Sequence, residues 1–454
     1  MIQLKLSKKI KYLEVEDSIR NSFEKPLIFY MENINDSSKF FITYVIVDYR
    51  NKQLIYLDTY IKENTELIDS LENKNFYTLH RTPHRSVSIH EGIDFFTFIQ
   101  EEELFFYVNY KDDYVKVYTF EDLLPDSSYH IKKIGSTFYK DCEDSNYMYM
   151  AAVDDNNHMH FYHVSLDLTK INEFSEIGGR TIPPHTLRRY KNYLFVSHDF
   201  GNAQFRKKGQ EKIIESTKLA TMFEVQKVKF RISKEDTSTS HIYHSVIGEH
   251  KLECVPGQVL VLDLKKKKEY YIQTNGTSPA HFEIDEKENM IYISSHNFFV
   301  WRGDNVYVEP AVIDKYQISD SGLEYVNTFK NEMGYRFTSH KFFYYNNQPY
   351  ICTFGHPNRL LIIDANTMQL AAFYDIEHDE LSSALSILDY INDRKSKFEI
   401  VPVEVSKDGR YIFFISDENI YVFDFAQRKI CQKMNYKENV CDVQLRTAHT
   451  DYLE

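Results

Sequence analysis

Histidines recur at the ends of short strand-like segments, and of all the features of the sequence they could most readily perform chemistry. Residues 277–296, TSPAHFEIDEKENMIYISSH, place His281 at the start of one strand pattern and His296 at the end of the next. The same positions are filled elsewhere in the chain. The histidines that start a strand are His84, His185, His281 and His340, and those that end the following strand are His198, His250, His296 and His356.

Imidazole groups that converge on one point suit a divalent transition metal. Neutral histidine nitrogen binds Fe, Cu, Zn, Mn and Ni, and three or four such ligands around an open position make a reactive site. A site of this kind holding Fe(II) or Cu would serve an oxygenase or oxidase, whereas Mn or Zn would serve a lyase or hydrolase. The predicted metal ligands are His84, His185, His281 and His340, with His250 as a further ligand. The predicted catalytic residues, which would orient the ligands or act as acid and base near neutral pH, are His198, His296 and His356.

Three arginines close to these histidines are the predicted substrate-binding residues. They are Arg85, Arg188 and Arg336. A guanidinium group binds a carboxylate through two parallel hydrogen bonds, so the expected partner is a small molecule with an anionic group. An ordinary role at the protein surface explains these arginines equally well.

A structural explanation of the histidines stands beside the metal site. A chain with 18 histidines places some at strand ends by chance, and a repeated histidine can also serve as a hydrogen-bond strut. We expect His160, His163 and His244, on outer strands, to be structural. The competing hypothesis for the whole chain is a non-catalytic scaffold that presents one face to protein partners.

The elements that must position these residues are short antiparallel strands. Residues 401–434, VPVEVSKDGRYIFFISDENIYVFDFAQRKICQKM, contain four strand patterns of period two joined by turns. Four hairpin-linked strands form one blade of a β-propeller. Further first strands are expected near residues 84, 137, 185, 228, 281, 340 and 403.

We therefore predict an all-β chain that forms a single closed β-propeller domain over residues 1–454. Its blades are four-stranded and antiparallel, and they number seven, with eight as the alternative. Residues 27–59 supply three further strands, and the tail 439–447 supplies one, so that N- and C-terminal strands close the ring. In a blade, the start of the first strand and the end of the second lie at the same edge, so all eight histidines would share the mouth of the central channel.

Two stretches, NGTSPAHFEIDEKENMIYISSHNFFVW (275–301) and GRYIFFISDENIYVFDFAQRKI (409–430), resemble repeats of the YVTN/lactonase-like β-propellers. That superfamily includes lactonases, lyases, redox enzymes and non-catalytic domains, so the resemblance implies the fold alone. Propeller enzymes that resemble the histidine arrangement include the carotenoid-cleaving oxygenases, which hold iron with four histidines from different blades.

Composition excludes several classes of protein. The net charge of −13 argues against a nucleic-acid binder, because phosphate contacts need a basic surface. The five cysteines lie far apart, which predicts reduced thiols and a cytoplasmic location. No stretch has the roughly 18 apolar residues of a membrane helix, so we expect no membrane partner and no signal peptide. The sequence leaves the oligomeric state open.

Overall fold

The fold is known from a computed structural model. The residues that it describes are 2–24, 26–36, 39–60, 86–88, 94–99, 104–109, 112–123, 131–134, 139–140, 147–165, 168–177, 186–197, 204–207, 213–215, 245–247, 250–255, 257–276, 278–296, 299–302, 305–308, 311–330, 337–355, 359–375, 401–415 and 419–436.

Almost all of these residues lie in antiparallel strands, and the fold is a seven-bladed β-propeller, as predicted. The described helices are two single turns, α1 (Asp17–Arg20) and α3 (Phe120–Leu123). Neither of them has the length or the apolar character needed to cross a lipid bilayer. The chain divides into two compact units, Met1–Leu187 with Val403–Asp451, and Arg188–Pro402 with Tyr452–Glu454. We number the blades 1 to 7 along the chain.

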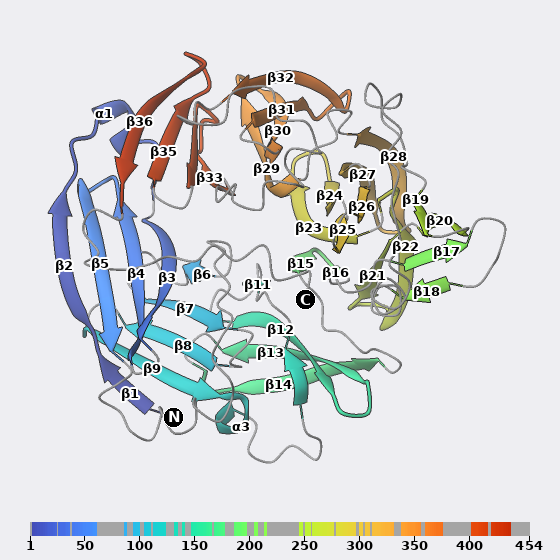
Figure 1. The fold of residues 1–454 in the computed structure, drawn as a ribbon, viewed down its shortest axis with the longest axis horizontal. Coiled ribbons are helices and arrows are strands. Elements are labelled where there is room, and N and C mark those ends of the chain that lie inside the picture. The colour runs from blue at the N-terminus through green and yellow to red at the C-terminus, as the bar shows by residue number, and fades with distance from the viewer. Residues whose placement is uncertain are drawn as a thin grey trace. The chain divides into compact units, whose positions relative to one another are not determined.

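Unit 1 holds blades 1, 2, 3 and 7 (Figure 1). Blade 1 consists of β3 (Leu27–Asp36), β4 (Lys39–Asp48), β5 (Gln53–Tyr60) and β2 (Ser7–Tyr12). Blade 2 consists of β6 (Ser86–Ser88), β7 (Asp94–Ile99), β8 (Leu104–Asn109), β9 (Tyr114–Thr119) and β1 (Ile2–Lys5). Blade 3 consists of β10 (Ile131–Ile134), β11 (Tyr139–Lys140), β12 (Tyr147–Asp154), β13 (Met159–Ser165) and β14 (Ile171–Ile177). Blade 7 consists of β33 (Val401–Val405), β34 (Tyr411–Ile415), β35 (Asn419–Asp424) and β36 (Lys429–Asn435).

Unit 2 holds blades 4, 5 and 6. Blade 4 consists of β15 (Leu187–Tyr190), β16 (Tyr193–Ser197), β21 (Gln258–Asp263) and β22 (Lys268–Gln273). Blade 5 consists of β23 (Ser278–Asp285), β24 (Met290–His296), β27 (Val312–Ser319) and β28 (Gly322–Lys330). Blade 6 consists of β29 (Phe337–Tyr345), β30 (Gln348–Gly355), β31 (Arg359–Asp364) and β32 (Gln369–Asp375).

In unit 2, two blades carry an insertion between their second and third strands. Blade 5 carries a hairpin of β25 (Phe299–Arg302) and β26 (Asn305–Val308). Blade 4 carries a separate sheet of β17 (Gln204–Lys207), β18 (Ile213–Glu215), β19 (Ser245–Ile247) and β20 (His250–Val255). The strand expected near residue 228 lies outside the described residues, but its neighbours belong to this inserted sheet. The sheet between β16 and β21 is therefore an insertion within blade 4, and the blade count is seven.

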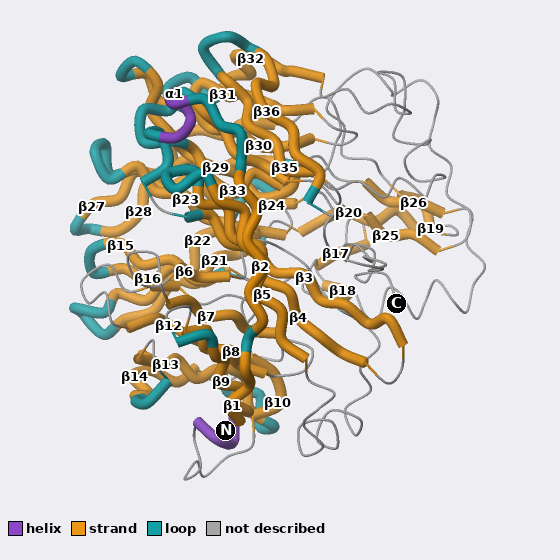
Figure 2. The backbone as a smooth tube through the Cα atoms, turned by 90° about the vertical axis from the view of Figure 1, so that its left-hand side faces the viewer, coloured by secondary structure: helices purple, strands orange, loops and turns teal. Residues whose placement is uncertain are grey.

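The fourth strand of blade 1 comes from the N-terminal segment. Strands β3, β4 and β5 are the three strands predicted over 27–59, and β2 pairs with β5 to complete the sheet (Figures 1 and 2). The tail 439–447, from which we expected this strand, lies outside the described residues. The cysteines with described side chains, Cys352 and Cys431, are not in a disulfide.

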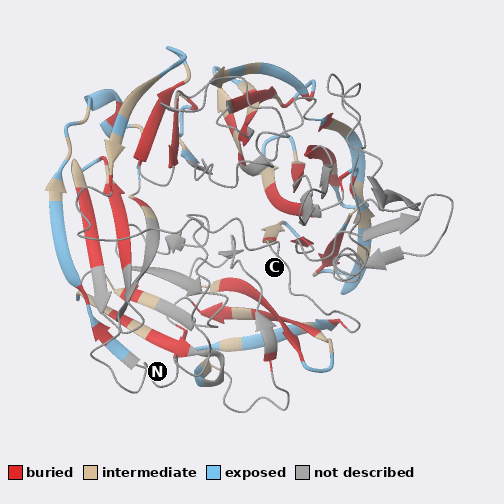
Figure 3. Cartoon of the chain, in the orientation of Figure 1, coloured by how far each residue is buried: buried red, intermediate tan, exposed pale blue. Residues whose placement is uncertain are grey.

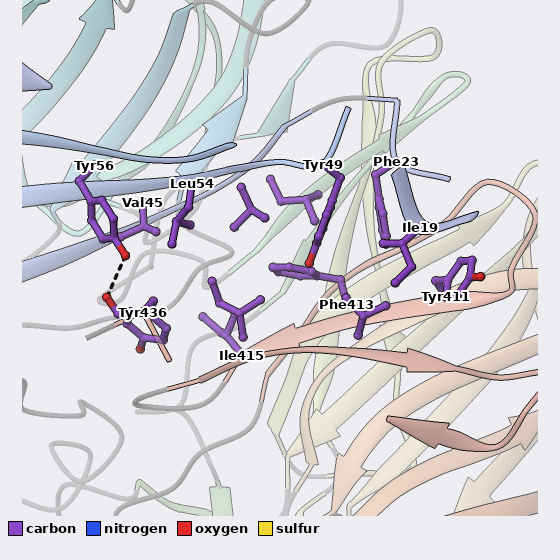
Figure 4. Packing of buried hydrophobic residues seen from close by; sticks show 14 residues of the cluster. Ile19, Phe23, Val45, Tyr49, Leu54, Tyr56, Tyr411, Phe413, Ile415 and Tyr436 are labelled. Carbon is purple, nitrogen blue, oxygen red and sulfur yellow. Dashed lines mark hydrogen bonds between the residues drawn. The ribbon is translucent and has the colours of Figure 1, made fainter. Parts of the chain in front are cut away.

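Apolar side chains fill the space between neighbouring blades within each unit, because both faces of the middle strands are buried (Figure 3). In unit 1, Phe23 of the N-terminal segment packs against Tyr49 and against Phe413 of blade 7 (Figure 4). The Tyr56 hydroxyl also donates a hydrogen bond to the Tyr436 carbonyl at 3.0 Å. Blades 1 and 7 are thereby joined.

Candidate metal centre

The structure describes the side chains of three of the predicted site residues, His281, His340 and Arg188, all in unit 2. Two more have a described backbone position only: His296 ends β24, and His250 begins β20. The predicted placement of His250 at the end of a blade's second strand is wrong, because this histidine begins a strand of the inserted sheet. Its role as a metal ligand stays a prediction. The predicted residues that lie outside the described part of the chain are His84, His185, His198, His356, Arg85 and Arg336.

His281 and His340 occupy equivalent positions in the first strands of blades 5 and 6. Each follows a β-bulge, between Pro279 and His281 in β23 and between Phe337 and His340 in β29. Each pairs with the hydroxyl residue 13 positions later, Ser294 or Thr353, and both of these are fully buried. A bulge re-aims the side chains that follow it, so the two histidines leave their strands in the same way.

A hydrogen bond between β23 and β29 shows that His281 and His340 lie at the same height along these two strands. Tyr344 Oη donates to Asp285 Oδ2 at 2.7 Å. Asp285 follows His281 by four positions, and Tyr344 follows His340 by four. Side chains at alternate positions share a face of a strand, so His281 lies on the face that bears Asp285, and His340 on the face that bears Tyr344. The two histidines therefore lie on the facing sides of blades 5 and 6.

Ring contacts of both strands agree with this arrangement. Phe342, on the same face of β29 as His340 and Tyr344, stacks on Tyr292 of blade 5 with ring centroids 5.1 Å apart. Phe282, on the opposite face of β23, contacts Phe195 of blade 4 with ring centroids 6.1 Å apart. One face of β23 is thus turned to blade 6 and the other to blade 4.

His340 is a buried, neutral imidazole. It is 1% exposed, and neither ring nitrogen makes a hydrogen bond of regular geometry with the described residues, although the backbone of Tyr292 is close enough to interact with the ring. Burial, reinforced by the positive charges of Lys341 and Arg188, lowers the pKa of His340 to about 3, although the nearby backbone of Tyr292 favours the charged ring. An uncharged ring with available nitrogens is the form in which histidine binds a metal.

Arg188 lies close enough to His340 for its charge to act on that ring. It stands two positions before Tyr190 in β15, so the two side chains share a face. The Tyr190 hydroxyl donates to Asn289 Oδ1 in blade 5 at 2.9 Å, which shows that this face is turned toward blade 5. The three predicted residues with described side chains therefore come from the first strands of three successive blades.

The connection between blades 4 and 5 holds β23 in place. Asn275 donates to both carboxylate oxygens of Asp314 in β27, through its backbone N and its Nδ2, at 2.8 Å each. Gly276 lies so near β24 that a Cβ there would stand 2.2 Å from Ser295 Cβ. This close approach requires glycine and fixes the chain just before His281.

Two further buried polar atoms lie beside the histidine strands. The hydroxyls of Ser294 and Ser295 in β24 have no hydrogen-bond partner among the described residues. An unsatisfied buried polar group costs about 1–3 kcal/mol, so such atoms mark places where a ligand or ion would be accommodated. Ser294 pairs with His281 and shares its face, whereas Ser295 lies on the opposite face of β24.

Sequence reasoning missed the residues that set the level of the two histidines, above all Asp285 and Tyr344. Their equal spacing of four from the histidines was visible in the sequence, but their pairing depends on how blades 5 and 6 lie against each other.

Sequence reasoning also missed a group of possible metal ligands in blade 3. His160, Glu173 and Glu176 place one ligand atom each within 4.8 Å of one another.

No family model matches the chain, and no curated protein matches it. Solved structures do. Two mutants of the apocarotenoid oxygenase of Synechocystis match with TM-scores of 0.52 and 0.50 and identities of 8% and 9%. The first match covers 96% of this chain and 93% of the oxygenase, and the second covers 94% and 92%. The dihydro-heme d1 dehydrogenase NirN matches with a TM-score of 0.43, 11% identity, and coverage of 90% of this chain and 73% of NirN. At these identities the similarity shows the fold alone.

Proposed function

We propose that the chain is a metal-dependent enzyme acting on a small molecule, with a histidine-bound Fe(II) or Cu in an oxygenase or oxidase. The observation that carries the proposal is the placement of His281 and His340. They stand at matching levels on facing sides of neighbouring blades, and the buried nitrogens of His340 make no hydrogen bond of regular geometry with the described residues.

The described residues fit such an ion. His340 is neutral at physiological pH, and imidazole nitrogens from separate strands suit Fe, Cu, Zn or Mn. His281 and His340 would hold the metal, with His84 and His185 as the remaining predicted ligands. A histidine-bound Fe(II) or Cu with open coordination positions supplies redox chemistry. The fold shared with an apocarotenoid oxygenase supports this reaction class, and we also propose that the chain is related to the YVTN/lactonase-like propellers.

The chain's own residues would bind and orient the substrate. Arg188, on the face of β15 turned to blade 5, would hold an anionic group of the substrate by two parallel hydrogen bonds. The apolar residues between blades 4, 5 and 6 would exclude water from the site.

Metal analysis tests the proposal. Untagged protein should contain about one equivalent of Fe or Cu, because a closed set of histidines retains its ion through purification. His281→Ala should abolish the bound metal. His340→Gln, which keeps a polar side chain in the buried position, should do the same while the circular dichroism of the β-sheets stays unchanged.

The matched control is His163→Gln, which alters a histidine stacked on Tyr147 in blade 3. It should leave the Fe or Cu content unchanged. A His281→Ala protein with full metal content and normal activity would refute the assignment. A wild-type protein without stoichiometric Fe or Cu would refute the oxygenase proposal and favour the scaffold hypothesis.

A further inference from the structure

A β-bulge in blade 3 gathers two carboxylates beside a buried histidine. His160 pairs with Glu176 across β13 and β14, and Tyr162 pairs with Glu173, because Phe174 is the extra residue of a bulge in β14. Side chains at positions three apart in a regular strand point to opposite faces. The bulge reverses this alternation, so Glu173 and Glu176 both lie on the face of His160.

The contacts within this group are close. His160 Nδ1 lies 2.9 Å from Glu173 Oε1. One ligand atom from each of His160, Glu173 and Glu176 lies within 4.8 Å of the other two. His158 Nδ1 also shares a short hydrogen bond with Glu176 Oε1. One buried imidazole and two carboxylates therefore meet at one edge of the blade, and His158 borders them through its contact with Glu176.

Asp154 contacts both the His160 ring and the turn that carries His158. Its Oδ1 accepts hydrogen bonds from the backbone amides of Asn156 and His158, at 2.9 and 2.8 Å, so the turn that carries His158 is fixed. Its Oδ2 lies 3.4 Å from His160 Nε2. A carboxylate behind the far nitrogen of a histidine holds the ring in orientation and makes the near nitrogen a stronger ligand.

Burial separates this arrangement from an ordinary pair of surface salt bridges. The side chains of His160 and Asp154 are 2% and 4% exposed, whereas those of His158, Glu173 and Glu176 are 43%, 34% and 48% exposed. The inner part is thus rigid, and the outer part is open to solution. An ion can enter from the solvent and meet one ligand that is already oriented.

We propose that His158, His160, Glu173 and Glu176 form a binding site for a divalent transition metal ion, with Zn²⁺ as the reference ion. Two nitrogen and two oxygen ligands make the tetrahedral set that Zn²⁺ accepts. Ligands of one such ion lie about 3.3 Å apart, so small side-chain rotations close the present group around it. The site is separate from the one formed by His281 and His340, and it fastens the outermost strand of blade 3 to its neighbour.

The test is calorimetric titration of the chelator-treated full chain with ZnCl₂. The wild type should bind one saturating ion at this site, and Glu173→Gln and Glu176→Gln should each weaken the affinity at least tenfold. Both glutamates are exposed, so these variants keep the fold. His158→Ala should weaken binding similarly, and Zn²⁺ should raise the unfolding temperature of the wild type but not that of the glutamine variants.

Glu269→Gln, which alters an exposed glutamate in the outermost strand of blade 4, is the matched control and should bind Zn²⁺ as the wild type does. Zn²⁺ affinities of Glu173→Gln and Glu176→Gln within twofold of the wild type would overturn the proposal. So would a wild type that shows no saturable binding. His281→Ala should retain this Zn²⁺ site, and Glu173→Gln should retain any Fe or Cu, so the two sites succeed or fail independently.

Discussion

At the scale of single residues, the protein places a histidine where its charged form cannot be solvated. His340 is 1% exposed, between a lysine and an arginine that both oppose protonation. An imidazole in such a place loses the switching behaviour that an exposed histidine shows between pH 5 and 8. It stays neutral over the physiological pH range.

The pH dependence of stability should reveal this state. The pKa of His340 is about 3 in the folded chain against an ordinary value of 6.5, so between these values the unfolded chain binds the proton and the folded chain does not. The stabilising contribution is complete above pH 6.5 and is lost as the pH falls toward 3. In chelator-treated protein, the unfolding free energy should fall by up to about 1.4 kcal/mol per pH unit more steeply in the wild type than in His340→Leu. Denaturant unfolding at pH 7, 6 and 5 measures this, and equal slopes would contradict it.

The equivalence of His281 and His340 could be inferred from the sequence, because the histidine and the hydroxyl residue opposite it recur with the same spacing. The site in blade 3 could not be inferred from the sequence. Glu173 and Glu176 are three positions apart, so in a regular strand their side chains would point to opposite faces. No sequence pattern predicts the bulge at Phe174. His160 was accordingly expected to be structural.

At the scale of elements, one type of turn recurs in a hairpin of each of blades 4, 5, 6 and 7. An aspartate ends a strand, its carboxylate accepts backbone N–H groups two or three residues on, and the residue four positions on has a positive φ. The aspartate and the positive-φ residue are Asp263 and Lys267, Asp285 and Asn289, Asp364 and Met368, and Asp424 and Arg428. With only 14 glycines, the chain fills these left-handed positions with side chains.

A glycine in such a position should stabilise the protein. Lys267 has φ 52° and is exposed, so Lys267→Gly removes the steric strain of the left-handed conformation without loss of packing. We expect the unfolding free energy to rise by about 1 kcal/mol, measured by denaturant unfolding. Lys265→Gly, in the same turn but without a positive φ, should lower it. A loss of stability in both variants would show that Lys267 is not strained.

The strands of the blades were predictable because their period of two and their turn residues recur, and so were their approximate starts. The inserted sheet of blade 4 was not. Its strands have the same local pattern as those of a blade, and only the pairing of β16 with β21 across more than fifty residues shows that β17 to β20 stand apart. Local pattern fixes an element, whereas long-range pairing decides the sheet to which it belongs.

At the scale of the molecule, unit 1 joins the two ends of the blade series. Blade 1 and blade 7 share one apolar cluster, and the N-terminal segment supplies part of it through α1 and Phe23 (Figure 4). The sequence predicted that terminal strands complete the sheet of the first blade. It did not indicate β2 as that strand, because the run of lysines in Ser7–Tyr12 lacks the apolar alternation of the other strands.

Removing one side chain should weaken this junction. Phe23 is 5% exposed and lies with its ring centroid 5.2 Å from that of Tyr49. Phe23→Ala should lower the unfolding free energy by about 3 kcal/mol, because it deletes a buried ring and leaves a cavity. Tyr12→Ala, in the same segment but 84% exposed, should change it by about 0.5 kcal/mol or less. Thermal or denaturant unfolding compares the two, and similar effects would mean that the N-terminal segment does not hold the junction.

Strands β1 and β2 are translated before the strands with which they pair. Lys8 pairs with Leu57, and Ile2 pairs with Val117, so both segments leave the ribosome well before their partners do. The nascent chain must keep them available until β9 has been translated, because β5 and β9 otherwise present bare edges to other chains. Slow translation or chaperone capture over the first 120 or so residues should therefore decide how much of the protein escapes aggregation in the cell.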